Sequence, residues 1–157
     1  MSSNKLSAKD KNTLYDYLCL YEYELKDKAG SFDLNHHELN TFLKTNRIYL
    51  GALNNSERKK SKKYSYTILY TQRRDDKVSK DDKVHHLLRH IRNSIAHGLI
   101  KKGKGRIASL QDRGKQDQET MQGQIEINLL YALINQLIKA NSSDYEKVII
   151  LIDCMFF

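Results

Sequence analysis

The sequence predicts a single, mostly helical domain with a small β-hairpin inserted after its third helix. Three observations support this prediction. The chain has 157 residues, a length that suits one domain with its own core. It contains no proline, so long helices can run without a break. Its apolar residues recur at helical spacing in four separate segments, and we therefore assign residues 1–157 to one domain.

The first 53 residues predict two amphipathic helices. One apolar stripe predicts a helix over residues 9–28, and it consists of Leu14, Leu18, Tyr21 and Leu25. Asn35 and Glu38 have the spacing of a capping box, which predicts a second helix that continues to Leu53. The tyrosine-rich residues 64–70 that follow fit a strand as well as a helix, so both interpretations stay open.

The third helix has the clearest pattern. Ser79 and Asp82 form another capping box at its start, and Gly98 marks its end. Its apolar stripe consists of Val84, Leu88, Ile91, Ile95 and Leu99. Residues 107–112 and 118–127 then predict two strands around a turn at residues 113–115. Residues 129–138 predict a fourth helix, and Ser143 with Glu146 predicts a last short element.

The charge distribution indicates an anionic partner, nucleic acid first. The net charge is +8 and the isoelectric point is near 9.4. Two basic clusters are candidate RNA-binding segments, with a merely solvated surface as the alternative for each. The first contains Lys59, Lys60, Lys62 and Lys63, and the second contains Lys101, Lys102, Lys104 and Arg106. Tyrosines beside the first cluster could stack on bases of single-stranded RNA, or they could pack onto the core.

Nothing in the sequence indicates a membrane or secreted protein. No window approaches the ~18 apolar residues of a membrane span, and the first twelve residues lack the apolar centre of a signal peptide. The two cysteines, Cys19 and Cys154, lie far apart without metal-ligand spacing, which is typical of reduced thiols. We therefore expect a cytoplasmic protein without membrane contact.

A polar stripe lies opposite the apolar stripe of the third helix. It consists of His86, His90, Asn93 and His97, with Arg89 and Arg92 at its border. We expect this stripe to face away from the core, where Arg89 and His90 could contact RNA. His86 and His90 have a spacing that can chelate zinc, but no carboxylate or thiol on the stripe completes a ligand set, so we expect no metal and no cofactor.

The run from Leu88 to Gly98, Leu-Arg-His-Ile-Arg-Asn-Ser-Ile-Ala-His-Gly, resembles the signature of HEPN domains. That signature is an arginine, usually followed by asparagine, then three residues and a histidine, and Arg92, Asn93 and His97 match it. With the hairpin and helix that follow, the likeness to small bacterial HEPN proteins covers about residues 80–140. The resemblance implies a helical bundle, usually dimeric, that acts as a metal-independent ribonuclease toxin or phage-defence effector, sometimes with an antitoxin protein.

The chemistry of the three residues agrees with this implication. RNA carries its own nucleophile, the 2′-OH, so cleavage requires positioning, proton transfer and charge stabilisation. His97 can exchange protons near neutral pH, Arg92 can hold the phosphate, and Asn93 can orient the imidazole or the sugar. The expected products are a 2′,3′-cyclic phosphate and a 5′-OH. A non-catalytic RNA-binding or dimerising HEPN protein is the alternative.

One geometric point concerns the separation of Arg92 and His97. Five residues on an ideal helix rotate about 500°, so the two side chains diverge by roughly 140°. A distorted helix, a long reach by Arg92, or a dimer could bring them to one phosphate. Because two-fold dimers are the commonest soluble oligomers, and the resemblance agrees, we expect a homodimer through this helix.

Overall fold

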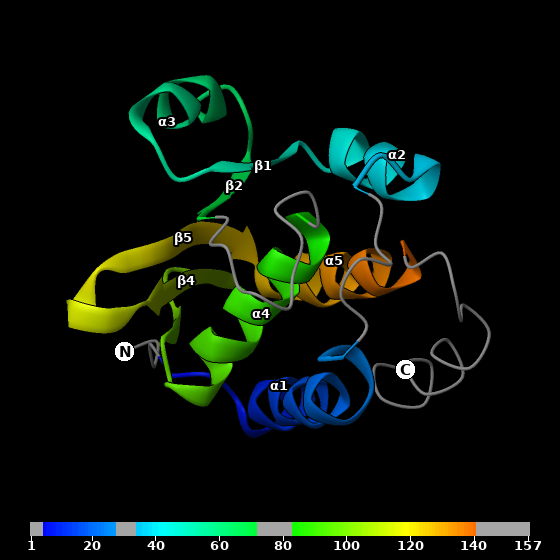
Figure 1. Ribbon diagram of the computed structural model, residues 1–157, viewed down its shortest axis with the longest axis vertical. Helices are drawn as coiled ribbons and strands as arrows, with labels where there is room; N and C mark the ends of the chain where they lie inside the picture. The colour runs from blue at the N-terminus through cyan, green and yellow to red at the C-terminus, as the bar shows by residue number, and fades with distance from the viewer. Residues whose placement is uncertain (1–4, 28–33, 72–82, 141–157) are drawn as a thin grey trace.

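The computed structural model describes residues 5–27, 34–71 and 83–140 (Figure 1). The expected helix start at Ser79 and the last element near Ser143 lie outside these residues. Of the described residues, 54% are helical and 24% lie in strands, and the strands form one five-stranded mixed sheet. The expectation of a helical bundle with a small hairpin is therefore wrong. The fold is a sheet with helices packed on it.

The element bounds are as follows. The α-helices are α1 (Ala8–Leu20), α2 (His37–Thr45), α3 (Asn55–Ser61), α4 (Lys83–Ala96) and α5 (Ile127–Lys139). A π-helix, η1 (Tyr21–Leu25), continues α1, and a 3-10 turn, η2 (Lys115–Asp117), joins the last two strands. The strands are β1 (Ile48–Ala52), β2 (Tyr66–Tyr70), β3 (Ile100–Lys102), β4 (Ile107–Arg113) and β5 (Glu119–Glu126).

The sheet has the order β1-β2-β5-β4-β3. Strands β1 and β2 are parallel, and the other neighbours are antiparallel. The predicted hairpin after α4 is confirmed as β4 and β5, and residues 66–70, which the sequence left open, form β2. The hairpin is not an insertion, however, because β5 joins it to β2 and makes it the centre of the sheet.

The second predicted helix is only half right. α2 ends at Thr45, its N-cap is His36 rather than Asn35, and Arg47 has a positive φ of 53°. Residues 48–52 then form β1, which pairs with β2 along its whole length. Apolar spacing does not separate a short buried strand from a helix, and here the pairing with residues 66–70 decides.

The two faces of the sheet are covered differently. Ile68 and Tyr70 of β2 belong to the main core, whereas Leu69 between them points to the opposite face and is also buried. Helix α3, which packs on β1 and β2, covers it there. Gly51 permits this close approach, because an added Cβ would lie 2.6 Å from a carboxylate oxygen of Glu57 on α3.

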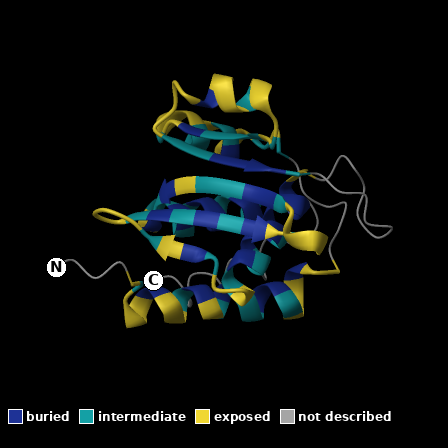
Figure 2. Cartoon of the chain, turned by 90° about the vertical axis from the view of Figure 1, so that its left-hand side faces the viewer, coloured by how far each residue is buried: buried dark blue, intermediate teal, exposed yellow. Residues whose placement is uncertain are grey.

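Helix α4 lies at the centre of the covered face. It packs on β4 and lies between α1 and α5 (Figure 1). Along β4, buried and less buried residues alternate, as Figure 2 shows for the middle of the sheet. Within the described part of the chain, no helix is long and apolar enough to cross a membrane.

Candidate active site at the C-terminal end of α4

Helix α4 is buried on more than one stripe. The five consecutive residues 84–88 are all buried, and so is His90. The expectation that the histidine stripe faces away from the core is therefore wrong for His86 and His90, which are 0% and 2% exposed. The physical reason is the sheet: α4 lies on β4 and also contacts α1 and α5, so its polar stripe is covered as well as its apolar one.

A buried polar network ties α4 to β4. The Nδ1 atom of His90 lies 2.7 Å from a carboxylate oxygen of Asp112, and its Nε2 atom lies 2.8 Å from the carbonyl oxygen of Thr71. Asn93 donates from Nδ2 to the same oxygen of Asp112 at 3.2 Å. Since a carbonyl and a carboxylate can only accept, both nitrogens of His90 are placed to donate.

This network sets the protonation of Asp112. Burial alone would raise the pKa of its carboxyl group, but hydrogen bonds from His90 and Asn93, with the charge of His90, hold that pKa below its ordinary value. His90 was a candidate RNA-binding residue. The structure places it in the interior with both ring nitrogens bonded within the chain, where it fixes the orientation of Asn93 through Asp112.

Arg92 points to the other side of α4, toward η1. Its Nε atom donates to Glu22 at 2.5 Å, Nη2 contacts the same carboxylate oxygen, and Nη1 donates to Oδ1 of Asn93 at 3.1 Å. Burial would raise the pKa of Glu22, but the hydrogen bond and charge of Arg92 lower it. Each side chain of this pair is 30% exposed, so solvent and a ligand can still reach the guanidinium.

His97 follows the last residue of α4. The helix ends there because Gly98 adopts φ +66°, with Gly98 and Leu99 donating backwards to the carbonyls of Ile95 and Ser94 in a Schellman arrangement. His97 is exposed, and its ring makes no hydrogen bond or ion pair to another described residue. The structure thus brings Arg92 into contact with Asn93, and it leaves His97 separate and open to solvent.

The basic candidates differ in their surroundings. Lys59, Lys62, Lys63, Lys101 and Lys104 are exposed, Lys102 is half-buried, and Lys60 is exposed but pairs with Glu57 at 2.7 Å. Arg89 is half-buried, with Nη2 lying 3.4 Å from Nδ1 of His86. Contacts of all these residues with RNA stay predictions.

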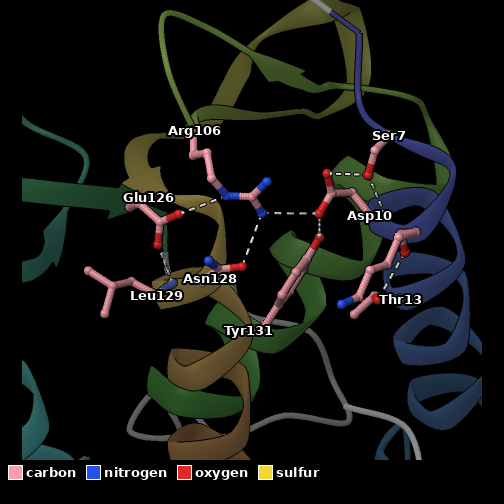
Figure 3. A network of polar contacts seen from close by, with 9 residues as sticks. Ser7, Asp10, Thr13, Arg106, Glu126, Asn128, Leu129 and Tyr131 are labelled. Atoms are coloured by element: carbon pink, nitrogen blue, oxygen red, sulfur yellow. Dashed lines mark hydrogen bonds and ion pairs between the residues drawn. The ribbon is translucent and has the colours of Figure 1, made fainter. Parts of the chain in front are cut away.

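Arg106 belongs to a structural network (Figure 3). Its guanidinium contacts Glu126 at 3.3 Å, Asn128 at 3.0 Å and Asp10 at 3.4 Å, and Tyr131 donates to the same oxygen of Asp10 at 2.9 Å. These contacts join the start of α1, the approach to β4 and the start of α5. The carboxylates of Asp10 and Glu126 already neutralise the charge of Arg106, so it offers less to RNA than the free lysines do.

The residues that support the motif could not be found by sequence reasoning. Glu22 and Asp112 lie 70 and 19 residues from their partners on α4. No short motif or periodicity links carboxylates to residues so distant. Among the described residues, no group of three or more histidine, cysteine, aspartate or glutamate side chains could hold a metal ion.

Comparison with known proteins identifies the family. A family model described as HEPN pEK499 p136 matches residues 10–147. No curated protein and no solved structure matches the chain. The matched segment includes α4 and all five strands, and it covers well over half of the sequence. The chain therefore belongs to the HEPN pEK499 p136 family, as the resemblance at residues 88–98 predicts.

Proposed function

We propose that this protein is a metal-independent endoribonuclease whose catalytic residues are Arg92, Asn93 and His97. The observation that carries the proposal is the end of α4 in a chain of the HEPN family. There an accessible arginine contacts a fixed asparagine, one turn before an exposed histidine with no partner among the described side chains.

The proposed reaction uses the 2′-OH of the RNA as the nucleophile. His97 takes the proton of the 2′-OH or gives one to the departing 5′-oxygen, and the new bond from O2′ to phosphorus displaces that oxygen. Arg92 stabilises the negative charge that develops on the phosphate. Asn93, held by Asp112, orients the sugar or the imidazole. The products are a 2′,3′-cyclic phosphate and a 5′-OH, and no metal is required.

Two copies of the chain complete the proposed site. Arg92 and His97 lie on different sides of α4, so we infer a homodimer in which the arginine of one copy and the histidine of the other flank one phosphate. A toxin or phage-defence role in the cytoplasm, with an antitoxin protein as a further partner, is part of the same proposal.

A non-catalytic, RNA-binding HEPN protein is the second candidate. The ion pair between Glu22 and Arg92 favours it, because a carboxylate that neutralises the guanidinium competes with a phosphate. The two candidates differ in one property: a binder retains affinity for RNA when His97 is removed, and an enzyme loses turnover.

The test is cleavage of labelled RNA by the purified protein with EDTA present. His97→Ala should lower the rate by about 10²–10⁴, the range of a lost acid–base group. Arg92→Ala should lower it by about 10²–10³, the range of a lost donor that stabilises the charge of the transition state. Matched controls are Arg113→Ala, an exposed and ion-paired arginine, and His37→Ala, an exposed histidine on α2, which should cleave like the wild type. Cleavage that survives both motif substitutions, or that EDTA abolishes, would refute the proposal.

A further inference from the structure

A polar groove lies on the face of the sheet opposite α4. Its volume is about 450 Å³, within the ~300–1,000 Å³ of pockets that hold small organic ligands. The register of the strands places its floor on this open face, since Gln124 pairs with Thr67 on one side and Ser109 on the other, and Gln122 pairs with Gln111. The alternate residues of the same strands, among them Leu110 and Ile125, point to the core.

The floor carries hydroxyl and amide side chains and no carboxylate. Threonine and serine hydroxyls and the glutamine amides can both donate and accept hydrogen bonds. Such a surface suits the edges of unpaired bases, the ribose hydroxyls and the phosphate oxygens alike. Helix α3 covers the apolar part of this face at Leu69, and beside it the glutamines stay open to solvent, Gln122 half-exposed and Gln124 exposed.

The wall of the groove is basic and aromatic. The segment after α3 contributes Lys62 and Tyr64 to the lining, and Arg58 of α3 donates to Gln122 at 3.1 Å. Tyr64 is 41% exposed, and its ring lies 4.9 Å from that of Tyr49, centroid to centroid. A supported and exposed aromatic ring beside lysines is the combination that holds single-stranded nucleic acid.

We propose that this groove binds single-stranded RNA, with a base stacked on Tyr64 and the backbone phosphates near Lys62. The choice of RNA rests on the proposed function. The groove itself is a second site, separated from the motif by the thickness of one sheet: Gln111 lines the groove, and the next residue of β4, Asp112, bonds to Asn93. The groove would hold the substrate on the face where no cleavage takes place.

The test is binding of a labelled 2′-O-methyl oligonucleotide, which cannot be cleaved by 2′-OH attack, measured by fluorescence anisotropy. Gln124→Glu changes one exposed amide to a carboxylate in the groove and should weaken binding at least roughly tenfold by repulsion of phosphate. Its matched control is Asn12→Asp, the same change on the exposed side of α1. Tyr64→Ala should also weaken binding roughly tenfold through lost stacking, whereas Tyr23→Ala, 85% exposed on η1, should not.

The outcomes separate the two proposals. Loss of affinity in Gln124→Glu and Tyr64→Ala but not in the controls supports the groove, even if the protein cleaves no RNA. Equal loss in Gln124→Glu and Asn12→Asp would mean general charge attraction and would overturn it. Wild-type affinity in the groove variants, or equal binding of a duplex of the same sequence, would also overturn the groove proposal. Neither result would count against cleavage by His97.

Discussion

Two carboxylates organise this molecule, and they do so in different surroundings. Asp112 lies between β4 and α4 and bonds to the buried imidazole of His90 and to Asn93 of the motif. Asp10 lies at the start of α1 and bonds to an arginine and a tyrosine far from the motif (Figure 3). The side chains of Asp112 and His90 are only 3% and 2% exposed, whereas Arg106, which contacts Asp10, is 46% exposed. The network nearest the proposed site is therefore closed to water, whereas water reaches the arginine of the other network.

Removal of Asp112 should have the greatest effect on stability. Asp112→Ala breaks a buried pair and leaves a ring nitrogen of His90 and the amide of Asn93 without their partner, so we expect the free energy of unfolding to fall by about 3–5 kcal/mol. Urea denaturation measures this loss. The control is Asp117→Asn, which removes the charge from an exposed pair with Arg113 and should cost under about 1 kcal/mol. Equal losses in the two variants would mean that the buried pair contributes no more to stability than the exposed pair does.

The stability of the protein should depend on pH through both carboxylates. Burial raises the pKa values of Asp112 and Asp10, but the hydrogen bonds that each carboxylate accepts lower them by more. Both pKa values are therefore lowered in the folded state. A lowered pKa contributes stability above the unfolded value of 3.8, and this stability is lost as the pH falls through the folded value. We therefore expect unfolding free energies to decline below pH 3.8, by at most about 1.4 kcal/mol per pH unit for each group. Asp10→Asn should flatten the decline, and an unchanged slope would exclude Asp10 as a contributor.

A smaller effect is expected from the hydroxyl of Tyr131. Tyr131→Phe removes the hydrogen bond to Asp10, and we expect a loss of about 1 kcal/mol in thermal or urea unfolding. The substitution also removes one cause of the lowered pKa of Asp10. Tyr23→Phe, at a ring that is 85% exposed, serves as the control and should leave stability unchanged. A loss in Tyr23→Phe as large as that in Tyr131→Phe would count against the network.

The smallest effect on stability should come from Glu22. Glu22→Gln weakens a half-exposed ion pair with Arg92, so we expect under about 1 kcal/mol in stability. Its effect on the proposed reaction should be opposite in sign, because a released guanidinium binds phosphate better. RNA cleavage should rise a few-fold, with the exposed Glu24→Gln as the control. A fall in cleavage would mean that Glu22 positions Arg92 rather than competing for it.

The helices and the hairpin illustrate what local patterns predict. The apolar stripe at Leu14 to Leu25, the stripe of α4 and the strands at residues 107–112 and 118–127 all appear where expected. Strands β1 and β3 were missed, because each is short and lies at an edge of the sheet. Their strand conformation depends on partners at residues 66–70 and 108–110, which no local window contains.

In the candidate site, too, some residues follow from the sequence and others only from the fold. Arg92, Asn93 and His97 follow from a spacing within one helix and from the family resemblance, and their roles stay proposals. Which histidines of α4 are buried, and which carboxylates contact Arg92 and Asn93, depends on β4 and η1 packing against that helix. A helical stripe states only which residues share a face, and it does not state whether another element covers that face.

Local patterns in the sequence thus predict the family, the helices α1, α4 and α5, the hairpin and the motif, because each depends on residues close together in the chain. The tertiary structure alone shows that these segments assemble on a five-stranded sheet, that His90 is buried with both ring nitrogens bonded, and that a polar groove opens on the far face. The reason is the range of the interactions, because helix periodicity acts over a few residues. By contrast, the pairing of β2 with β5 joins residues 51 to 57 positions apart, and the bonds from His90 to Thr71 and from Arg106 to Asp10 join residues 19 and 96 positions apart.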